Sequence, residues 1–93
     1  IDIREKKDVL STGIIKDSFH LETFNSKGNI NSNFVKEYKA ITRENDHVVI
    51  ISQNGDFSSI LANGLVENLG MKNIYTLKGG ISRWVGLGKT LIK

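Results

Sequence analysis

The chain has no cysteine among its 93 residues. This absence excludes disulfides, thiolate catalysis and zinc sites built on cysteine. It does not identify a compartment, because a chain without cysteine suits any redox environment, and we take the cytoplasm as the default expectation. No apolar run approaches the roughly 20 residues that a membrane-spanning helix needs, and no signal-peptide pattern opens the chain. We therefore expect no membrane association.

The sequence also lacks a concentrated charge. Its 13 Lys and Arg and 10 Asp and Glu give a net charge of +3, and the basic residues are scattered. No stripe of lysine and arginine alternates with aromatic residues, so the sequence does not predict nucleic-acid binding. His20 and His47 have no acidic partner at the spacing of metal ligands, so we expect neither a metal site nor a cofactor.

Length and composition indicate one globular domain over residues 1–93, with 39% hydrophobic and 25% charged residues. The first residues, Ile1-Asp2-Ile3, have the pattern of the end of a buried strand. We therefore expect that the first strand is truncated, or that the chain is a fragment of a longer protein.

Strands and helices are predicted to alternate along the chain. Apolar patterning predicts strands at 1–3, 18–21, 48–51 and 73–77, and helices near Val9-Leu10, at 34–41 after Asn33 as N-cap, at 58–69 and at 81–85. The helix at 58–69 is expected to bury Ile60, Leu61, Leu65 and Leu69. Residues 25–33 have the composition of a solvated connection, whose length would also allow a partner to bind. This order predicts an α/β domain with a mostly parallel sheet flanked by helices.

The most informative segment is the apolar strand 48–51, which runs into a polar loop at 52–58 and then a helix. A strand, loop and helix in this order direct backbone N–H groups and a helix N-terminus towards one point, which suits an anion or an activated nucleophile. The loop contains no histidine, lysine or arginine. Two other strands are expected to end at the same edge of the sheet as this loop, at Arg4-Glu5 and at Lys78-Gly79-Gly80. These residues would then line one crevice together with the loop.

Four segments together resemble a single-domain rhodanese. They are Asp2-Ile3-Arg4-Glu5, Gly13-Ile14-Ile15, Val48 to Ser59, and Asn73 to Trp84 with its Leu-Lys-Gly-Gly turn. The resemblance implies a three-layer α/β fold with an active-site loop after the central strand. In catalytic members this loop begins with a cysteine that carries sulfur as a persulfide.

The resemblance places Ser52 at the cysteine position, Gly55 at the loop glycine and Phe57 where arginine is usual. It also places Ile14 where histidine is usual. Serine cannot form a persulfide, and its hydroxyl needs a general base. Phe57 removes a cation, and Asp56 adds a negative charge beside it.

The resemblance and these replacements together predict a rhodanese-like domain without sulfurtransferase activity. Such a domain would act as a binding or regulatory module whose loop, Ser52-Gln53-Asn54-Gly55-Asp56-Phe57-Ser58, meets a protein partner or a small anion. The alternative is an active thiosulfate sulfurtransferase whose catalytic cysteine has been replaced by Ser52. A third hypothesis is hydrolysis or phosphoryl transfer by the serine itself.

Two interpretations remain open for each of three loop side chains. Ser52 is either a nucleophile or a residue that hydrogen-bonds within its own loop. Asp56 is either the base for that serine or an N-cap or turn residue just before the following helix. Phe57 is either an exposed recognition residue or the filling of a vacated pocket.

The neighbouring segments carry similar pairs of interpretations. Arg4 and Glu5 either line the crevice or form an ion pair that holds the strand end. Lys78 and the two following glycines either bind an anion or form a tight turn that needs a positive φ. Trp84 is expected to be a packing residue.

Overall fold

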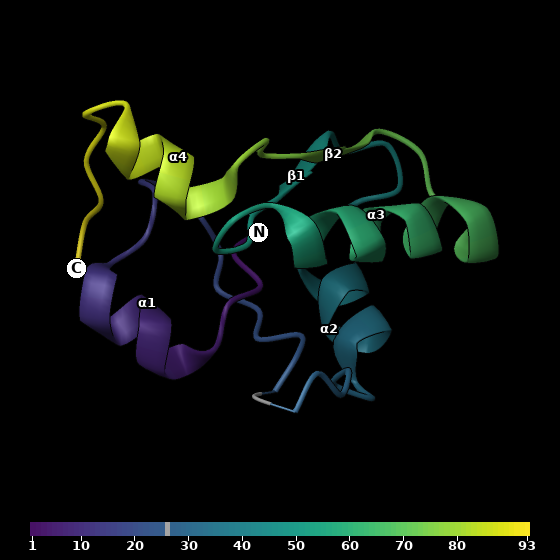
Figure 1. The fold of residues 1–93 in the computed structure, drawn as a ribbon. Helices are drawn as coiled ribbons and strands as arrows, with labels where there is room; N and C mark the ends of the chain where they lie inside the picture. The colour runs from purple at the N-terminus through teal and green to yellow at the C-terminus, as the bar shows by residue number, and fades with distance from the viewer. Residues whose placement is uncertain (26) are drawn as a thin grey trace.

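The structure is a computed structural model that describes residues 1–25 and 27–93. These residues form four helices and two strands (Figure 1). In chain order the elements are α1 (Lys6–Thr12), α2 (Phe34–Ile41), β1 (Val48–Ile50), α3 (Asp56–Leu69), β2 (Ile74–Thr76) and α4 (Gly80–Gly86). The helices predicted by the sequence are therefore all present. Within the described ranges, no helix is long and apolar enough to cross a membrane.

The strands form a parallel sheet. β1 pairs with β2, with Val48 opposite Ile74 and Ile50 opposite Thr76. Asp2 adds a parallel bridge to Ile51 on one side and to His20 on the other. The strands predicted at 1–3 and 18–21 are thus reduced to single bridged positions, although backbone hydrogen bonds extend the pairing on either side of Asp2.

The main core lies between the sheet and the pair α2 and α3, while α1 and α4 lie together at the other end of the molecule (Figure 1). Burial alternates along β1, because successive side chains point to opposite faces of a strand. The core consists of Ile3, Leu21, Phe34, Tyr38, Val48, Ile50, Leu61 and Leu65. The opposite side is closed in part by Ile51 and by Ile81 of α4, which are 6% and 2% exposed.

The longest helix, α3, begins at Asp56, two residues before the predicted start, and ends before Gly70. Its buried residues, Ser58, Leu61, Ala62 and Leu65, follow the i, i+3, i+4, i+7 spacing of a single helix face. The predicted stripe was wrong at both ends, since Ile60 and Leu69 are 63% and 52% exposed. Ile60 points away from the buried face, and Leu69 lies in the last turn beside an open cavity.

The connection predicted at 25–33 is a compact turn, with Ser26 outside the described residues. Phe24 and Ile30 pair across it in an antiparallel bridge, and Asn25 Oδ1 accepts hydrogen bonds from the N–H groups of Lys27 and Asn29. Asn33 precedes α2 as predicted, but its side chain forms no capping hydrogen bond.

Candidate functional site

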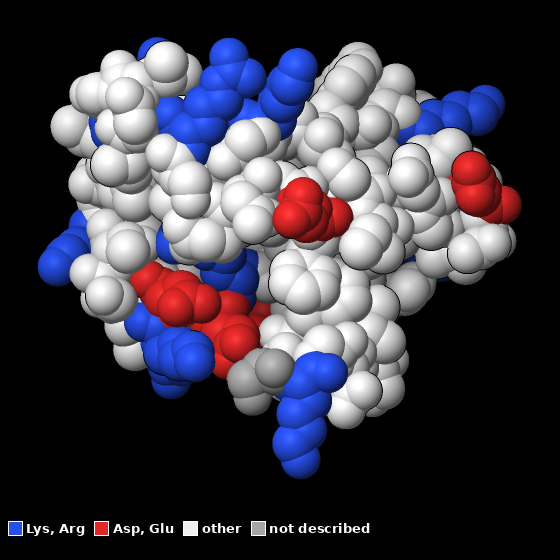
Figure 2. All heavy atoms as spheres, viewed as in Figure 1, with Lys and Arg blue, Asp and Glu red and all other residues white. Residues whose placement is uncertain are grey.

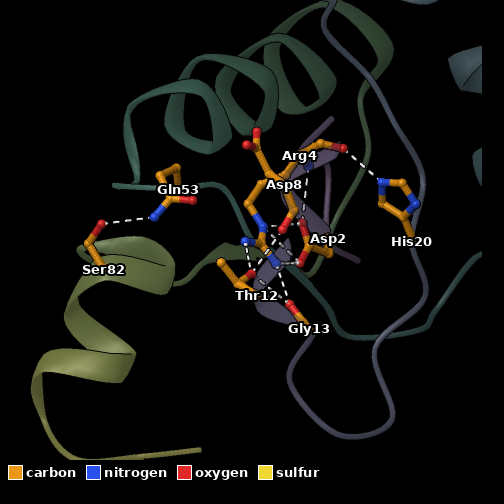
Figure 3. Close-up of polar contacts among 8 residues, drawn as sticks. All are labelled: Asp2, Arg4, Asp8, Thr12, Gly13, His20, Gln53 and Ser82. Atoms are coloured by element: carbon orange, nitrogen blue, oxygen red, sulfur yellow. Dashed lines mark hydrogen bonds and ion pairs between the residues drawn. The ribbon is translucent and has the colours of Figure 1, made fainter. Parts of the chain in front are cut away.

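The polar loop 52–58 lies at the carboxyl end of β1, and the start of α4 holds its backbone in place. At the start of α4, Ile81 N–H donates to Ser52 O at 3.0 Å and Ser82 N–H donates to Gln53 O at 2.9 Å. The Gln53 amide also donates to Ser82 Oγ at 3.1 Å, as Figure 3 shows. Because the loop carbonyls take these first N–H groups of α4, those groups are not free to bind an external anion.

The double glycine before α4 allows this close approach. Gly79 and Gly80 have φ angles of 77° and 59°, and a Cβ at Gly80 would overlap Ser52 O and lie 2.7 Å from the Gln53 carbonyl carbon. Gly55 has φ 95°, and a Cβ there would lie 3.1 Å from Gly79 N. The geometry therefore fits the tight-turn interpretation of Gly79 and Gly80, while Lys78 is exposed beside them.

The hydroxyl of Ser52 is enclosed in a ring of hydrogen bonds, and the residue is only 3% exposed. Ser52 Oγ accepts from the N–H groups of Gly55 and Ser58, at 3.1 and 3.3 Å. It donates to Ser58 Oγ at 3.0 Å, and that hydroxyl in turn donates to Gly55 O, also at 3.0 Å. This geometry matches the interpretation of Ser52 as a residue that hydrogen-bonds within its own loop.

Asp56 is placed differently from both sequence interpretations. It is the first residue of α3 and is exposed, and its carboxylate makes no hydrogen bond to Ser52. The N-cap is instead Gly55, which has a left-handed conformation, and the helix begins at the next residue, Asp56. The Asp56 N–H is bound by Asn54 Oδ1 at 3.2 Å, so Asn54 supplies the polar side chain at this helix start.

Phe57 combines features of its two interpretations. Its side chain is 49% exposed, and its ring lies 5.0 Å from the ring of Phe24, with 30° between the two planes. The pair places a half-exposed aromatic surface beside the loop. Phe24 was not singled out by the sequence, because its contact with Phe57 joins segments that are distant along the chain.

Arg4 lies beneath the loop but is not available to a ligand. It is 5% exposed and forms a buried ion pair with Asp2, at 2.8 Å between Nη2 and Oδ2 (Figure 3). The guanidinium also donates to Thr12 Oγ1 at 2.9 Å and to Gly13 O at 2.8 Å. The ion pair expected for Arg4 therefore exists, but with Asp2 rather than Glu5. Glu5 is the residue before α1 and makes no capping hydrogen bond with its side chain.

The Rhodanese-like domain family model matches residues 1–87, nearly the whole chain. The chain belongs to the rhodanese-like domain family. The resemblance identified from the sequence and the α/β fold with a parallel sheet are thereby confirmed. A crystal structure of a rhodanese-related protein from Thermoplasma volcanium matches with a TM-score of 0.69 and 24% identity, over 99% of this chain and 80% of that chain. None of the curated proteins searched matches.

The loop 52–58 of this rhodanese-like domain contains one charged residue, Asp56. On the face shown in Figure 2, acidic and basic side chains gather around α1 and further basic side chains lie along the edge over α4, whereas the surface over the first turn of α3 is uncharged apart from an acidic side chain. Asp56 is acidic in that first turn, where a carboxylate interacts favourably with the helix dipole. The loop therefore combines a neutral to acidic surface with a half-exposed phenylalanine.

Two residues named from the sequence have hydrogen bonds that the sequence did not predict. Ser58 was included only as a loop residue, yet it both donates to and accepts from the ring around Ser52. Trp84 was expected to pack, and its indole Nε1 donates to Thr90 O at 2.9 Å, with Lys89 Nζ 5.2 Å from the ring centroid. A serine in the first helical turn is a general signal for such local hydrogen bonds.

Proposed function

We propose that this rhodanese-like domain does not transfer sulfur and instead binds a protein partner through the face formed by residues 52–58. The observation that carries the proposal is the closed hydrogen-bond ring around Ser52. A residue in the position of a sulfur carrier must present an open, reactive atom to its substrate. In this chain that position holds a buried hydroxyl whose proton and lone pairs are already engaged.

The chemistry of oxygen supports the same conclusion. A persulfide forms when a thiolate displaces sulfur from a donor, whereas a hydroxyl remains protonated near neutral pH and requires a base. The Ser52 hydroxyl donates its hydrogen bond to the Ser58 hydroxyl. In the part of the chain that the structure describes, no carboxylate accepts a hydrogen bond from either serine. This arrangement also disfavours hydrolysis or phosphoryl transfer by Ser52.

The distribution of cations argues against an anionic substrate at the loop. The position of the usual family arginine is occupied by Phe57, and the nearest buried guanidinium, Arg4, has its donors directed to Asp2, Thr12 and Gly13. A thiosulfate ion at this edge would meet the Asp56 carboxylate, and the nearby cations Lys78 and Arg83 are exposed side chains that no ion pair fixes within the described residues. The half-exposed aromatic surface of Phe57 on Phe24 is better suited to contact a protein, because aromatic residues are enriched in such interfaces.

One observation favours the alternative of an active sulfurtransferase whose catalytic cysteine has been replaced by Ser52. The N–H groups of Gly55 and Ser58 both point at the side-chain atom of residue 52, at the start of a 14-residue helix. A thiolate at this atom would gain from the same donors and from the helix dipole. The alternative therefore predicts that a single substitution restores full activity.

Sulfur transfer from thiosulfate to cyanide separates the two hypotheses. We expect no turnover above a buffer control for the unaltered protein, little for Ser52→Cys, and more for Ser52→Cys with Phe57→Arg. Ser59→Cys is the matched control, because that exposed residue lies on the same helix and its hydroxyl donates to Gly55 O and to no other described residue. Turnover by the unaltered protein would refute the proposal. Equal activity of the single and double variants would show that the missing cation is unimportant and would favour the alternative.

The binding half of the proposal requires a separate measurement. A photoreactive phenylalanine analogue at position 57 is expected to form specific adducts with a partner in the source cells. The same analogue at Tyr75, which is 48% exposed on β2, serves as the control. Adducts that form equally at both positions, or at neither, would contradict a partner-binding role for the loop.

A further inference from the structure

A cavity lies at the opposite end of α3 from the Ser52 loop. It has a volume of about 550 Å³ and is bordered by the end of α2, the segment joining α2 to β1, and the end of α3. Figure 1 shows that this end of the molecule faces away from α1 and α4. Because α3 has 14 residues and a helix rises about 1.5 Å per residue, roughly 20 Å separates the cavity from the loop.

A buried tyrosine supplies an unused hydrogen-bond donor to this cavity. Tyr38 is 5% exposed and its ring packs 5.7 Å from that of Phe34, which fixes its position. It lines the cavity, and its hydroxyl hydrogen-bonds to no residue in the described ranges 1–25 and 27–93, although it is not sealed from solvent. Burial, and secondarily the nearby Asp46 carboxylate, raise the pKa of Tyr38 above its usual 10.0, so the hydroxyl keeps its proton.

The rim of the cavity carries more positive than negative charge. Lys39, Arg43 and Lys72 border it, together with Glu44 and Asp46. None of these five side chains forms an ion pair within the part of the chain that the structure describes. One Asp46 carboxylate oxygen accepts the backbone N–H of Arg43 at 2.8 Å, which closes the turn at 43–46 and leaves the Arg43 guanidinium free.

The remaining wall is apolar. Leu69, Met71 and Ile74 line this side, and Leu69 is 52% exposed in the last turn of α3. Small-molecule sites typically have volumes of about 300–1,000 Å³, with an apolar lining and a few convergent polar groups. The cavity thus combines an apolar wall, one buried donor and an excess of cations.

We propose that this cavity binds a small amphipathic organic anion, with a carboxylate held by Tyr38 and Arg43 and an apolar body against Leu69, Met71 and Ile74. Both carboxylate contacts are charge-assisted, which makes them the strongest hydrogen bonds available here. The site is independent of the loop function, because it shares no residue with positions 52–58.

The proposal is tested with 2-naphthoate in a titration followed by amide chemical shifts of the 15N-labelled protein. We expect saturable shifts confined to residues 38–46 and 69–74. Tyr38→Phe removes only the hydroxyl and should weaken binding about tenfold, the usual effect of losing one hydrogen bond to a charged group. Tyr75→Phe is the matched control, because Tyr75 lies outside the cavity and its hydroxyl contacts His47. Shifts that do not saturate, or equal affinities of the two variants, would overturn the proposal.

A second set of variants and ligands tests whether binding requires the positive charge of Arg43 and the negative charge of the ligand. Arg43→Gln should weaken binding of 2-naphthoate. Arg83→Gln should not, because Arg83 is an exposed residue of α4 outside the cavity. The neutral analogue 2-naphthylmethanol should bind at least tenfold more weakly than the acid, since it lacks the carboxylate. Equal binding of the acid and the alcohol would show that the cations take no part and would refute an anion site.

Discussion

Replacing Gly80 with alanine should disturb the Ser52 loop far more than replacing Gly70, although the two glycines have nearly the same backbone conformation. Their φ angles are 59° and 64°. An alanine at either position adopts a left-handed conformation that costs about 1–2 kcal/mol. The surroundings differ, because a Cβ at Gly70 meets nothing within 4 Å, whereas one at Gly80 overlaps Ser52 O and approaches Gln53 C and O to 2.7 Å.

The contact atoms at Gly80 are backbone, so they cannot rotate away as a side chain would. Forcing atoms into a packed region typically costs a further 1–3 kcal/mol or so. We therefore expect Gly80→Ala to lower the free energy of unfolding by about 2–5 kcal/mol, against about 1–2 kcal/mol for Gly70→Ala. In a domain of this size, each kcal/mol corresponds to roughly 4–8 °C in the melting temperature.

Urea unfolding of the two variants measures this difference directly. Amide spectra of the folded Gly80→Ala protein should show shifts across residues 52–58, because the loop must move to accommodate the new methyl group. The Gly70→Ala spectrum should leave those signals unchanged. If both variants lost the same stability and kept identical loop signals, the reasoning that α4 packs directly onto the loop backbone would be refuted.

Two further predictions concern buried polar groups. Asp2→Asn should lower the free energy of unfolding by about 3–5 kcal/mol, because it leaves the Arg4 guanidinium buried without its counter-charge. Asp17→Asn, an exposed position, should cost less than about 0.5 kcal/mol in the same urea assay, and similar losses would disprove a buried ion pair. The raised pKa of Tyr38 means that its contribution to stability is complete below about pH 10 and is lost as the pH rises through the folded-state pKa. Tyr38→Phe should therefore lose less stability between pH 9 and 11 than the unaltered protein, and parallel losses would contradict the assignment.

The parts of the site that could be predicted from the sequence are those fixed by local chemistry. The apolar run at 48–51 is a strand because four β-branched residues occur together, and Gly79-Gly80 is a tight turn because both residues adopt positive φ. The loop between strand and helix follows from the same local signals. Its place in the chain can therefore be predicted locally, whereas its shape also depends on the hydrogen bonds from α4.

The partners of the site residues could not be predicted in this way. Asp2 and Arg4 are two apart on an extended segment, which places both side chains on one face, but the choice of Asp2 over Glu5 depends on burial. The contact between Phe57 and Phe24 requires the turn around residue 28 to bring distant segments together. The exposure of Ile60 reflects which helix face meets the sheet, and hydrophobicity alone does not specify that face.

The loop has the same backbone supports whether or not it carries out chemistry. Its carbonyls are bound by α4, and its N–H groups at positions 55 and 58 are bound by the side chain of residue 52. An oxygen at that side-chain position satisfies those donors in the way a sulfur would, and Gly80 keeps α4 in contact with the loop whatever residue 57 is. These supports are therefore compatible with the proposed binding role as well as with catalysis. For this reason loop shape and family membership do not decide activity, and the proposal that sulfur transfer is absent rests on the side chains at positions 52 and 57.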